Sequence, residues 1–355
     1  MKKKELLSLV KDKKVFLACH WDADGVSSGA MLYHLIKDHC KITGLVSKGD
    51  TFEINMEDIK GNPDLVICAD IQPGKDLDPK KVIYIDHHPL KNKDIFRYVL
   101  HDESIQSCSL LIWEEMFKES DDPYIIFLTL IGYFGDSGKR NSIPPELHIK
   151  AMKLMPELME KRNSFNGYFY EIERYVSLFN TGKRIEWSGD VPLRLLIEIE
   201  HYNPIIYGTH PLAQQLFVYR NELKKLYQME INIMDQGLFH YSIINCPANI
   251  QGVLCARYMK NKPIICMNNV NGNIIGSMRV PDHVDFDAGK FLSQLNGRFK
   301  SYIGGGHEKA GGFSVSSEEF KEVFDVLLNS KDGSLIEQKE QNSQQTISNS
   351  RTNNY

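Results

Sequence analysis

The sequence predicts a two-domain α/β protein, in which a parallel-sheet domain is joined by a long helical connector to a smaller α/β domain. Residues 14–100 alternate short β-rich runs with longer helical patterns, which is typical of βαβ units and a parallel sheet. A long helical pattern begins at 209, and strand patterns resume near 237. The length of 355 residues and the hydrophobic content of 42% are sufficient for two hydrophobic cores.

The predicted domain limits follow these changes of pattern. We expect a first domain at 1–185, a connector at 186–236 and a second domain at 237–330. The segment 331–355 is polar and nearly devoid of large apolar residues, so we expect it to be disordered.

The elements of the first domain are predicted from apolar runs and the residues that interrupt them. Strands are expected near 15–19, 42–47, 64–69, 82–85 and 97–100. After Asp24-Gly25 an amphipathic helix is expected to pack back on the sheet. Further helices are expected at 104–119 and 123–134, and the chain is mainly helical from about 144.

The connector is predicted to contain a single long helix. Thr209 or His210 as N-cap and Pro211 in the first turn predict about 24 helical residues, roughly 36 Å in length. In the second domain, Asn271-Gly272 predicts a type I′ hairpin turn. Strands are expected there at 239–245, 263–270 and 273–280, and helices at 252–260, 287–295 and 317–329.

Composition excludes several classes of protein. The net charge of -4 argues against a broad basic face that coats duplex DNA. The seven cysteines form no CxxC pair and most lie in apolar runs, as in a reduced protein. No stretch approaches the roughly 18 apolar residues of a membrane span, and the apolar run near the amino end is too short for a secretory signal. We expect a cytoplasmic protein that does not enter a membrane.

The chemistry of the first domain is predicted to lie where apolar runs end, because four of these runs end in Asp or His. The residues are His20, Asp22, Asp24, Asp70, Asp86, His87, His88 and Asp136. In an open parallel sheet, ligands bind outside the carboxyl ends of the strands. Clustered carboxylates repel one another without cations, and carboxylates with imidazoles suit Mn²⁺. A pair of such ions activates water for in-line attack on phosphorus.

Single members of this set also have structural interpretations. Asp24 alone is compatible with a helix cap, with His20 incidental, and Asp70 is compatible with a turn. Asp136 in GDSG is on its own a typical cap after a buried helix. Asp86-His87-His88 is a stronger signal, because two adjacent imidazoles behind an acid at a strand end have little use in a hydrophobic core. The four aspartates together favour a metal centre.

The second domain contains the glycine-rich loop GGGHEKAGG at 304–312, whose five glycines flank His307. Glycines let backbone N–H groups approach an anion closely, although they are also ordinary loop residues. Arg279, in the strand GSMRV, is either a phosphate-binding fork or a surface arginine.

Taken together, these motifs resemble the DHH phosphoesterase superfamily, in its branch with a carboxyl-terminal DHHA1 domain. The resemblance is carried by DADG, the Asp of VICAD, DHH, GDSG, GSMR and GGGHEKAGG, and it is weak over 140–235. The branch includes RecJ-type single-strand exonucleases, nanoRNases that also act on adenosine bisphosphate, and cyclic-dinucleotide phosphodiesterases. GGGH loops also occur in a domain of alanyl-tRNA synthetase.

The resemblance implies roles for individual residues. Two Mn²⁺ ions, with Mg²⁺ as a substitute, would be held by His20, Asp22, Asp24, Asp70, His87 and Asp136, with Asp70 as the bridging ligand. His88 would contact the scissile phosphate or assist the leaving group, and Asp86 would orient the site. The neighbouring phosphate or terminal nucleotide would be gripped by Arg279, Gly304, Gly305, Gly306 and His307, so that the active site would lie in the cleft between the domains.

One spacing departs from many small-substrate members of that superfamily. His20-Trp21-Asp22 leaves one residue between the first His and the first Asp, whereas those members have three. The spacing is closer to the RecJ-type pattern, which has an acid at the position of His20. It favours a nuclease that acts on single strands.

The resulting hypothesis is a Mn²⁺-dependent phosphodiesterase that removes nucleotides from an end of single-stranded DNA or RNA. The alternative enzyme acts on very short oligonucleotides, cyclic dinucleotides or adenosine bisphosphate. A different class is a non-catalytic replication or repair scaffold, and an inorganic pyrophosphatase shares the first half of the pattern. Basic side chains either line a strand-binding groove or form a solvated face, and they are Arg220, Lys224, Lys225, Arg298, Lys300 and Lys309. The segment 331–355 is a candidate tether for a helicase or repair partner.

Overall fold

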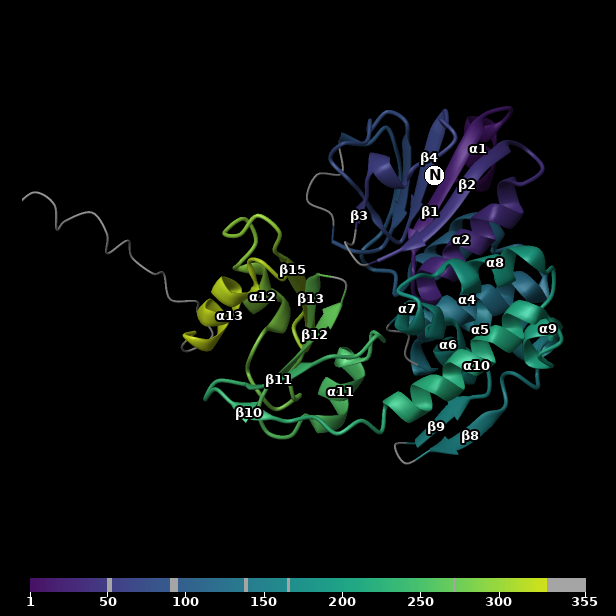
Figure 1. The fold of residues 1–355 in the computed structure, drawn as a ribbon. Coiled ribbons are helices and arrows are strands. Elements are labelled where there is room, and N and C mark those ends of the chain that lie inside the picture. The colour runs from purple at the N-terminus through teal and green to yellow at the C-terminus, as the bar shows by residue number, and fades with distance from the viewer. Residues whose placement is uncertain (50–52, 90–94, 137–139, 165–166, 271, 331–355) are drawn as a thin grey trace, which may run out of the picture. The chain divides into compact units, whose positions relative to one another are not determined.

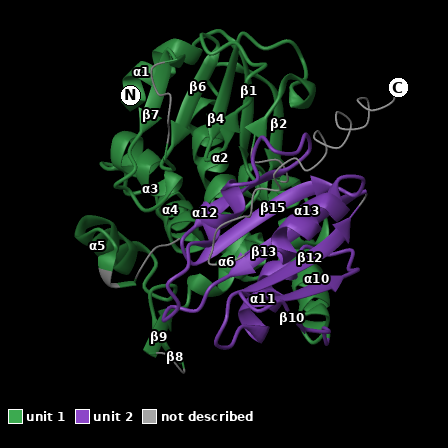
Figure 2. Ribbon diagram, turned by 90° about the vertical axis from the view of Figure 1, so that its left-hand side faces the viewer, with its two compact units in different colours: residues 1–229 green, residues 230–355 purple. Residues whose placement is uncertain are grey.

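The computed structural model describes residues 1–49, 53–89, 95–136, 140–164, 167–270 and 272–330 (Figure 1). The chain divides into two compact units, 1–229 and 230–355, which Figure 2 distinguishes by colour. The predicted disordered segment and Asn271 of the predicted hairpin turn lie outside the described residues. No helix within the described ranges is long and apolar enough to cross a membrane.

Unit 1 is built on a parallel sheet with the strand order β2-β1-β4-β6-β7. Its strands are β1 Lys14–His20, β2 Lys41–Lys48, β4 Leu65–Ala69, β6 Val82–Asp86 and β7 Tyr98–His101. Each neighbouring pair is parallel, which confirms the predicted fold class and its strands. A short accessory pair, β3 Glu53–Ile54 and β5 Gln72–Pro73, lies beside it, with a 3₁₀ turn at Met56–Asp58.

Both faces of the sheet are buried, which explains why its strands are continuous apolar runs. In β1, Leu17 and Cys19 belong to the core formed with the helices. Phe16 and Ala18, which point to the opposite face, belong to a smaller core formed with residues such as Ile54.

Helices of unit 1 pack on one face of the sheet (Figure 1). The central ones are α2 Ala23–Ile36, α3 Cys108–Ile112 and α4 Pro123–Gly135, and α2 contacts β1, α3 and α4. Gly29 permits the close approach of α2 to the sheet, because a Cβ there would lie 2.8 Å from Cys19 Sγ. The helix predicted at 104–119 is interrupted, since α3 continues as a π-helical turn, η3 Trp113–Phe117.

The remaining elements of unit 1 are mainly helical, as predicted. They are α1 Lys3–Val10, a 3₁₀ turn at Arg140–Ser142, α5 Pro145–Leu154, α6 Glu173–Phe179, α7 Thr181–Ile185, α8 Asp190–Glu198, α9 Asn203–Ile206 and α10 Pro211–Leu226. An antiparallel hairpin, β8 Lys161–Ser164 and β9 Gly167–Tyr170, was not predicted.

The long connector helix is shorter than predicted. Helix α10 has 16 residues and ends at Leu226, whereas about 24 were expected. It begins at Pro211 behind a His210 cap, as expected, and it packs on α7 and α8 within unit 1. The chain then alternates apolar and polar residues with two β-branched isoleucines, at 231 and 233, which favours extended backbone. The domain limits at 185 and 236 stay predictions.

Unit 2 is a second, smaller α/β unit, as predicted, with the strand order β10-β11-β12-β13-β15-β14. Its strands are β10 Met234–Asp235, β11 His240–Ile244, β12 Ile264–Val270, β13 Asn273–Arg279, β14 Ile303–His307 and β15 Ala310–Ser316. Its helices are α11 Gln251–Tyr258, α12 Ala288–Ser293 and α13 Phe320–Leu328. Strands β11 and β12 are parallel and the other pairs are antiparallel.

The glycine-rich segment is a hairpin rather than the loop expected. Strands β14 and β15 pair Gly306 with Gly311 and His307 with Ala310. Glycine is required because α12 lies against this hairpin: a Cβ on Gly289 would lie 2.1 Å from the Gly306 carbonyl oxygen. Gly306 also has φ +133°, a conformation that other residues rarely adopt.

Candidate metal centre

The predicted acids and histidines of unit 1 lie at one edge of its sheet. Within the strand register, Ala69 pairs with Cys19 on one side and with Ile85 on the other. The residues that follow these three positions are His20, Asp70 and Asp86. Because the strands are parallel, the three side chains emerge at the same carboxyl edge.

One group of side chains forms around His20. Its Nδ1 lies 3.0 Å from Asp22 Oδ2 and 3.8 Å from Asp70 Oδ2. Asp22 also caps helix α2 by accepting the Gly25 N–H at 3.1 Å. The helix cap is therefore Asp22, which corrects the interpretation of Asp24 as the cap.

A second group forms around His87. Its Nε2 lies 3.8 Å from Asp24 Oδ2, 3.6 Å from Asp70 Oδ1 and 3.5 Å from Asp136 Oδ2. Asp70 thus presents Oδ2 to the first group and Oδ1 to the second. This is the position that a bridging ligand requires.

The donor atoms of this centre fit a cation. Asp70 Oδ1 and His87 Nε2 are buried, and neither accepts or donates a hydrogen bond within the part of the chain that the structure describes. Buried polar atoms nearly always have a hydrogen-bond partner, so these two atoms indicate a site for a bound ligand. Carboxylate oxygens and imidazole nitrogens are donors that suit Mn²⁺, and carboxylates alone suit Mg²⁺.

The backbone holds two of the acids in place. Asp24, 1% exposed, accepts the N–H of Cys108 at 2.6 Å and the N–H of Ser109 at 3.0 Å, so both of its oxygens are fixed by the start of α3. Asp70 adopts φ 60°, in the left-handed region that is uncommon for residues other than glycine. Such conformations cluster at functional sites.

The carboxylates of the centre have strongly shifted pKa values. Burial raises the pKa of Asp24 to about 6, with Asp136 adding to the effect and His87 opposing it. Burial and the neighbouring acids, Asp24 first among them, raise the pKa of Asp70 well above its usual range. Burial also acts on Asp22, but His20 and Lys183 outweigh it and hold the pKa of that carboxyl well below its usual range. Bound cations would relieve the repulsion around Asp70.

Asp86 organises both histidines of the DHH motif. Its Oδ1 accepts the backbone N–H of His87 at 2.6 Å and that of His88 at 3.0 Å, and it lies 2.9 Å from His88 Nδ1. Its Oδ2 accepts the hydroxyl of Tyr84 at 2.6 Å. Burial raises the pKa of Asp86, but these hydrogen bonds and the charge of His88 lower it overall.

The two histidines differ in what they face. His87 Nδ1 lies 3.2 Å from the Ile105 carbonyl, so a proton on Nδ1 leaves the Nε2 lone pair facing the carboxylates. His88 is the more open of the two, with 37% of its side chain exposed against 9% for His87. Burial opposes protonation of His88, but Asp86 raises its pKa to about 9. His88 is thus a cationic donor at the rim of the centre.

Comparisons with known proteins support this arrangement at the level of the fold. No family model and no curated protein match the sequence. A DHH-domain structure, described as a member of a family of ribosomal proteins, matches with a TM-score of 0.60 and 14% identity, over 91% of this chain and 87% of that one. An exonuclease RecJ bound to manganese matches with a TM-score of 0.58 and 17% identity, over 93% of this chain and 94% of that one.

This chain has the DHH fold. A third match, RecJ from Thermus thermophilus in complex with Mn²⁺, has a TM-score of 0.58 and 16% identity. It aligns over 91% of this chain and 53% of that one, so the present chain spans about half the length of that RecJ.

Sequence reasoning missed several residues that this DHH fold places at the centre. Tyr84 and His101 support the motif, and the ring of His101 lies 2.7 Å from the His88 carbonyl oxygen. Lys183 Nζ lies 3.5 Å from Asp22 Oδ2, and Asn180 Oδ1 accepts the N–H of Ala23 at 3.1 Å. The position of Tyr84 could have been predicted from the sequence, because Tyr84 lies two residues before Asp86 in a strand and therefore on the same face.

The substrate-binding residues predicted in unit 2 lie on adjacent strands. Arg279 ends β13 and pairs with Ala310 of β15, which in turn pairs with His307 of β14. The Arg279 guanidinium donates to the Met278 carbonyl oxygen at 2.8 Å. The hairpin residues are Gly304, Gly305, Gly306 and His307. Their predicted contact with a phosphate, and the predicted cleft between the domains, stay predictions.

Proposed function

We propose that this chain is a metal-dependent phosphodiesterase that removes nucleotides from an end of single-stranded DNA or RNA. The observation that carries the proposal is the position of Asp70, whose two oxygens face two separate groups of acids and histidines. The RecJ structures of similar fold contain Mn²⁺ or Mg²⁺, which supports the same ions here. The proposal places the chain in the DHH superfamily, in the branch with a DHHA1 domain.

The proposed ligands form two sets that share Asp70. His20 and Asp22 belong to the first set, and the second set consists of Asp24, His87 and Asp136. When bound, two Mn²⁺ ions supply Lewis acidity to a phosphoryl oxygen and lower the pKa of water to make a nucleophile. The chain's own contribution is to hold the carboxylates in place through the N–H groups of α2 and α3.

His88 is the proposed contact to the substrate. With its Nδ1 bound to Asp86, the other ring nitrogen is the donor that remains for a phosphate oxygen or for the departing oxygen. Tyr84 and the backbone N–H groups fix Asp86, so the imidazole is oriented before substrate arrives. In unit 2, Arg279 and the β14–β15 hairpin are the proposed grip for a neighbouring phosphate or terminal nucleotide.

The test is digestion of 5′-labelled and 3′-labelled single-stranded DNA and RNA, alongside dinucleotides, with Mn²⁺ and with EDTA. Asp136→Ala removes a proposed ligand, and Asp121→Asn is a control for loss of one acidic charge away from the centre, because Asp121 is an exposed acid paired with Lys150. We expect stepwise loss from one end with Mn²⁺, lost in EDTA and in Asp136→Ala but kept in Asp121→Asn. Cleavage confined to dinucleotides would replace the exonuclease by the oligonucleotide alternative, and no turnover would refute a phosphodiesterase.

The cytoplasmic location and the helicase or repair partner of 331–355 belong to the same proposal and rest on composition alone. If deletion of 331–355 leaves every captured repair partner in place, the segment is not the tether.

A further inference from the structure

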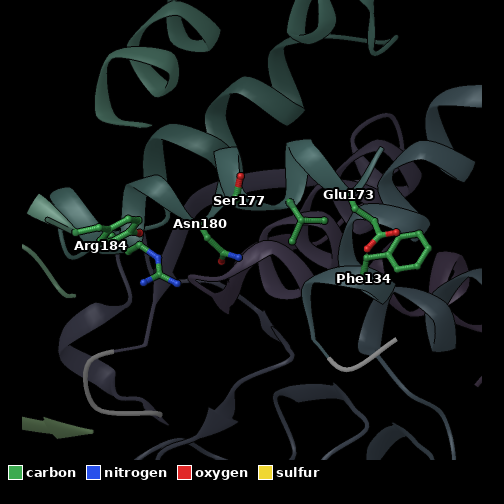
Figure 3. Close-up of a pocket in the computed structure, with 7 residues that line it drawn as sticks. Phe134, Glu173, Ser177, Asn180 and Arg184 are labelled. Atoms are coloured by element: carbon green, nitrogen blue, oxygen red, sulfur yellow. The ribbon is translucent and has the colours of Figure 1, made fainter. Parts of the chain in front are cut away.

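A cavity of about 230 Å³ lies in unit 1. Figure 3 shows its lining: Phe134 and Glu173 lie at one end, Arg184 lies at the other, and Asn180 lies between them. The residues come from α4, α6 and α7, from the link between the last two, and from Tyr227 at the end of α10. Nothing in the predicted mechanism uses this cavity.

The cavity shares its wall with the metal centre. Asn180 Oδ1 accepts the N–H of Ala23, the residue between the proposed ligands Asp22 and Asp24. Phe134, at one end of the cavity, lies two residues before Asp136 in the chain. The cavity and the metal centre therefore adjoin through Asn180 and the start of α2.

The end of the cavity near Arg184 is suited to an anion. Arg184 contacts the ring of Tyr227, with its guanidinium carbon 6.0 Å from the ring centroid, and no acid within the described ranges forms an ion pair with it. Glu173 does not neutralise Arg184, because Arg140 binds both Glu173 oxygens, at 2.8 and 2.7 Å. Within the described residues, the Nδ2 of Asn180 donates to no other group, since the hydrogen bond to Ala23 uses Oδ1.

The other end presents an aromatic ring beside a carboxylate that Arg140 already binds, the carboxylate of Glu173. Phe134 is half-buried and lines the cavity together with Val176. Aromatic side chains are the usual stacking platforms for the bases of single strands. The volume is below the roughly 300–1,000 Å³ of sites for drug-sized ligands, so it suits one nucleotide rather than a dinucleotide.

We propose that this cavity binds one nucleotide of the substrate next to the cleaved bond. Arg184 and Asn180 bind its phosphate, and its base stacks on Phe134. This inference rests on the proposed function, because it names a subsite of the same centre. It predicts that the enzyme requires at least one nucleotide beyond the scissile phosphate for tight binding.

The test compares Arg184→Gln with Arg194→Gln, a matched loss of one positive charge on α8, where Arg194 is exposed and lies 3.4 Å from Glu198. Two substrates are used: an oligothymidylate, and bis(4-nitrophenyl) phosphate, which offers no second phosphate. We expect Arg184→Gln to raise KM for the oligonucleotide about tenfold or more, as for loss of a charge-assisted hydrogen bond, with kcat within about twofold. Hydrolysis of the nitrophenyl ester stays unchanged, and Arg194→Gln leaves both reactions unchanged.

Binding without turnover separates this inference from the proposed function. Fluorescence anisotropy of labelled oligothymidylate in EDTA should show weaker binding for Arg184→Gln and Phe134→Leu than for wild type and Arg194→Gln. If wild type hydrolyses neither the oligothymidylate nor bis(4-nitrophenyl) phosphate but these binding differences hold, the proposed function fails and the subsite stands. If Arg184→Gln matches Arg194→Gln in both KM and anisotropy, the subsite is refuted while the phosphodiesterase stands.

Discussion

Replacement of Tyr84 by Phe tests whether the Tyr84 hydroxyl, in strand β6, stabilises Asp86 of the DHH motif. The Tyr84 side chain is fully buried, and its hydroxyl donates to Asp86 Oδ2 at 2.6 Å. Removing that hydroxyl leaves a buried carboxylate, 1% exposed, with one donor fewer. Hydrogen bonds to charged groups contribute about 1.5–3 kcal/mol, so we expect a loss of about 2 kcal/mol in the free energy of unfolding.

That loss corresponds to a fall of roughly 4–8 °C in Tm for a unit of this size. The matched control is Tyr124→Phe, because the hydroxyl of Tyr124 is also buried and donates over the same 2.6 Å, but to the neutral carbonyl of Leu196. A neutral hydrogen bond contributes about 1 kcal/mol, so the control should lose about half as much. Thermal unfolding of both variants and wild type in EDTA measures the difference.

The pH dependence of this difference identifies the charge on Asp86 as its cause. The pKa of Asp86 is held below its usual value of 3.8, with the Tyr84 hydroxyl among the causes. A depressed carboxyl pKa contributes stability that is present above pH 3.8 and is lost as the pH falls through the folded-state value. The cost of Tyr84→Phe should therefore shrink towards acid pH, whereas that of Tyr124→Phe should not. Equal costs for the two variants at neutral pH would refute the assigned role of Tyr84.

Three other variants test the centre itself. In EDTA at neutral pH, Asp70→Asn should raise Tm, because it removes a buried carboxyl whose pKa is raised by burial and by Asp24. Mn²⁺ should raise the Tm of wild type but not of this variant. Differential scanning fluorimetry measures both changes. Gly132→Ala should lower Tm and weaken Mn²⁺ binding by titration calorimetry, since its Cβ would lie 2.2 Å from Ser109 Oγ and 2.4 Å from Asp24 Oδ1. In EDTA, His88→Gln should cost more stability at pH 6 than at pH 9.5. The pKa of His88 is raised from 6.5 to about 9, so its contribution to stability is present below pH 6.5 and is lost as the pH rises through 9. A cost independent of pH would contradict the Asp86–His88 contact.

The sheet and its polar ends were predictable because both depend on local pattern. Each strand of unit 1 is a short apolar run, and Asp70 and Asp86 lie where such runs stop. In a parallel sheet these ends must share an edge, so the cluster followed from the runs without knowledge of their order. The GGGHEKAGG segment was harder to predict, because its glycines fit both a loop and a hairpin covered by a helix. Only the pairing of β14 with β15 decides between them.

The sequence by itself determined the α/β class, the strands of unit 1 and the acids and histidines at their ends, since apolar periodicity and the residues that end it are local properties. Only the tertiary structure decided that Asp22 rather than Asp24 caps α2, and that Asp70 presents one oxygen to each group. It alone also brought Asn180 to Ala23, across a separation of 157 residues, and Arg184 into the adjoining cavity. These positions depend on which helix faces pack together. Side chains that are distant in sequence contribute to the free energy of that packing, so no single segment determines it.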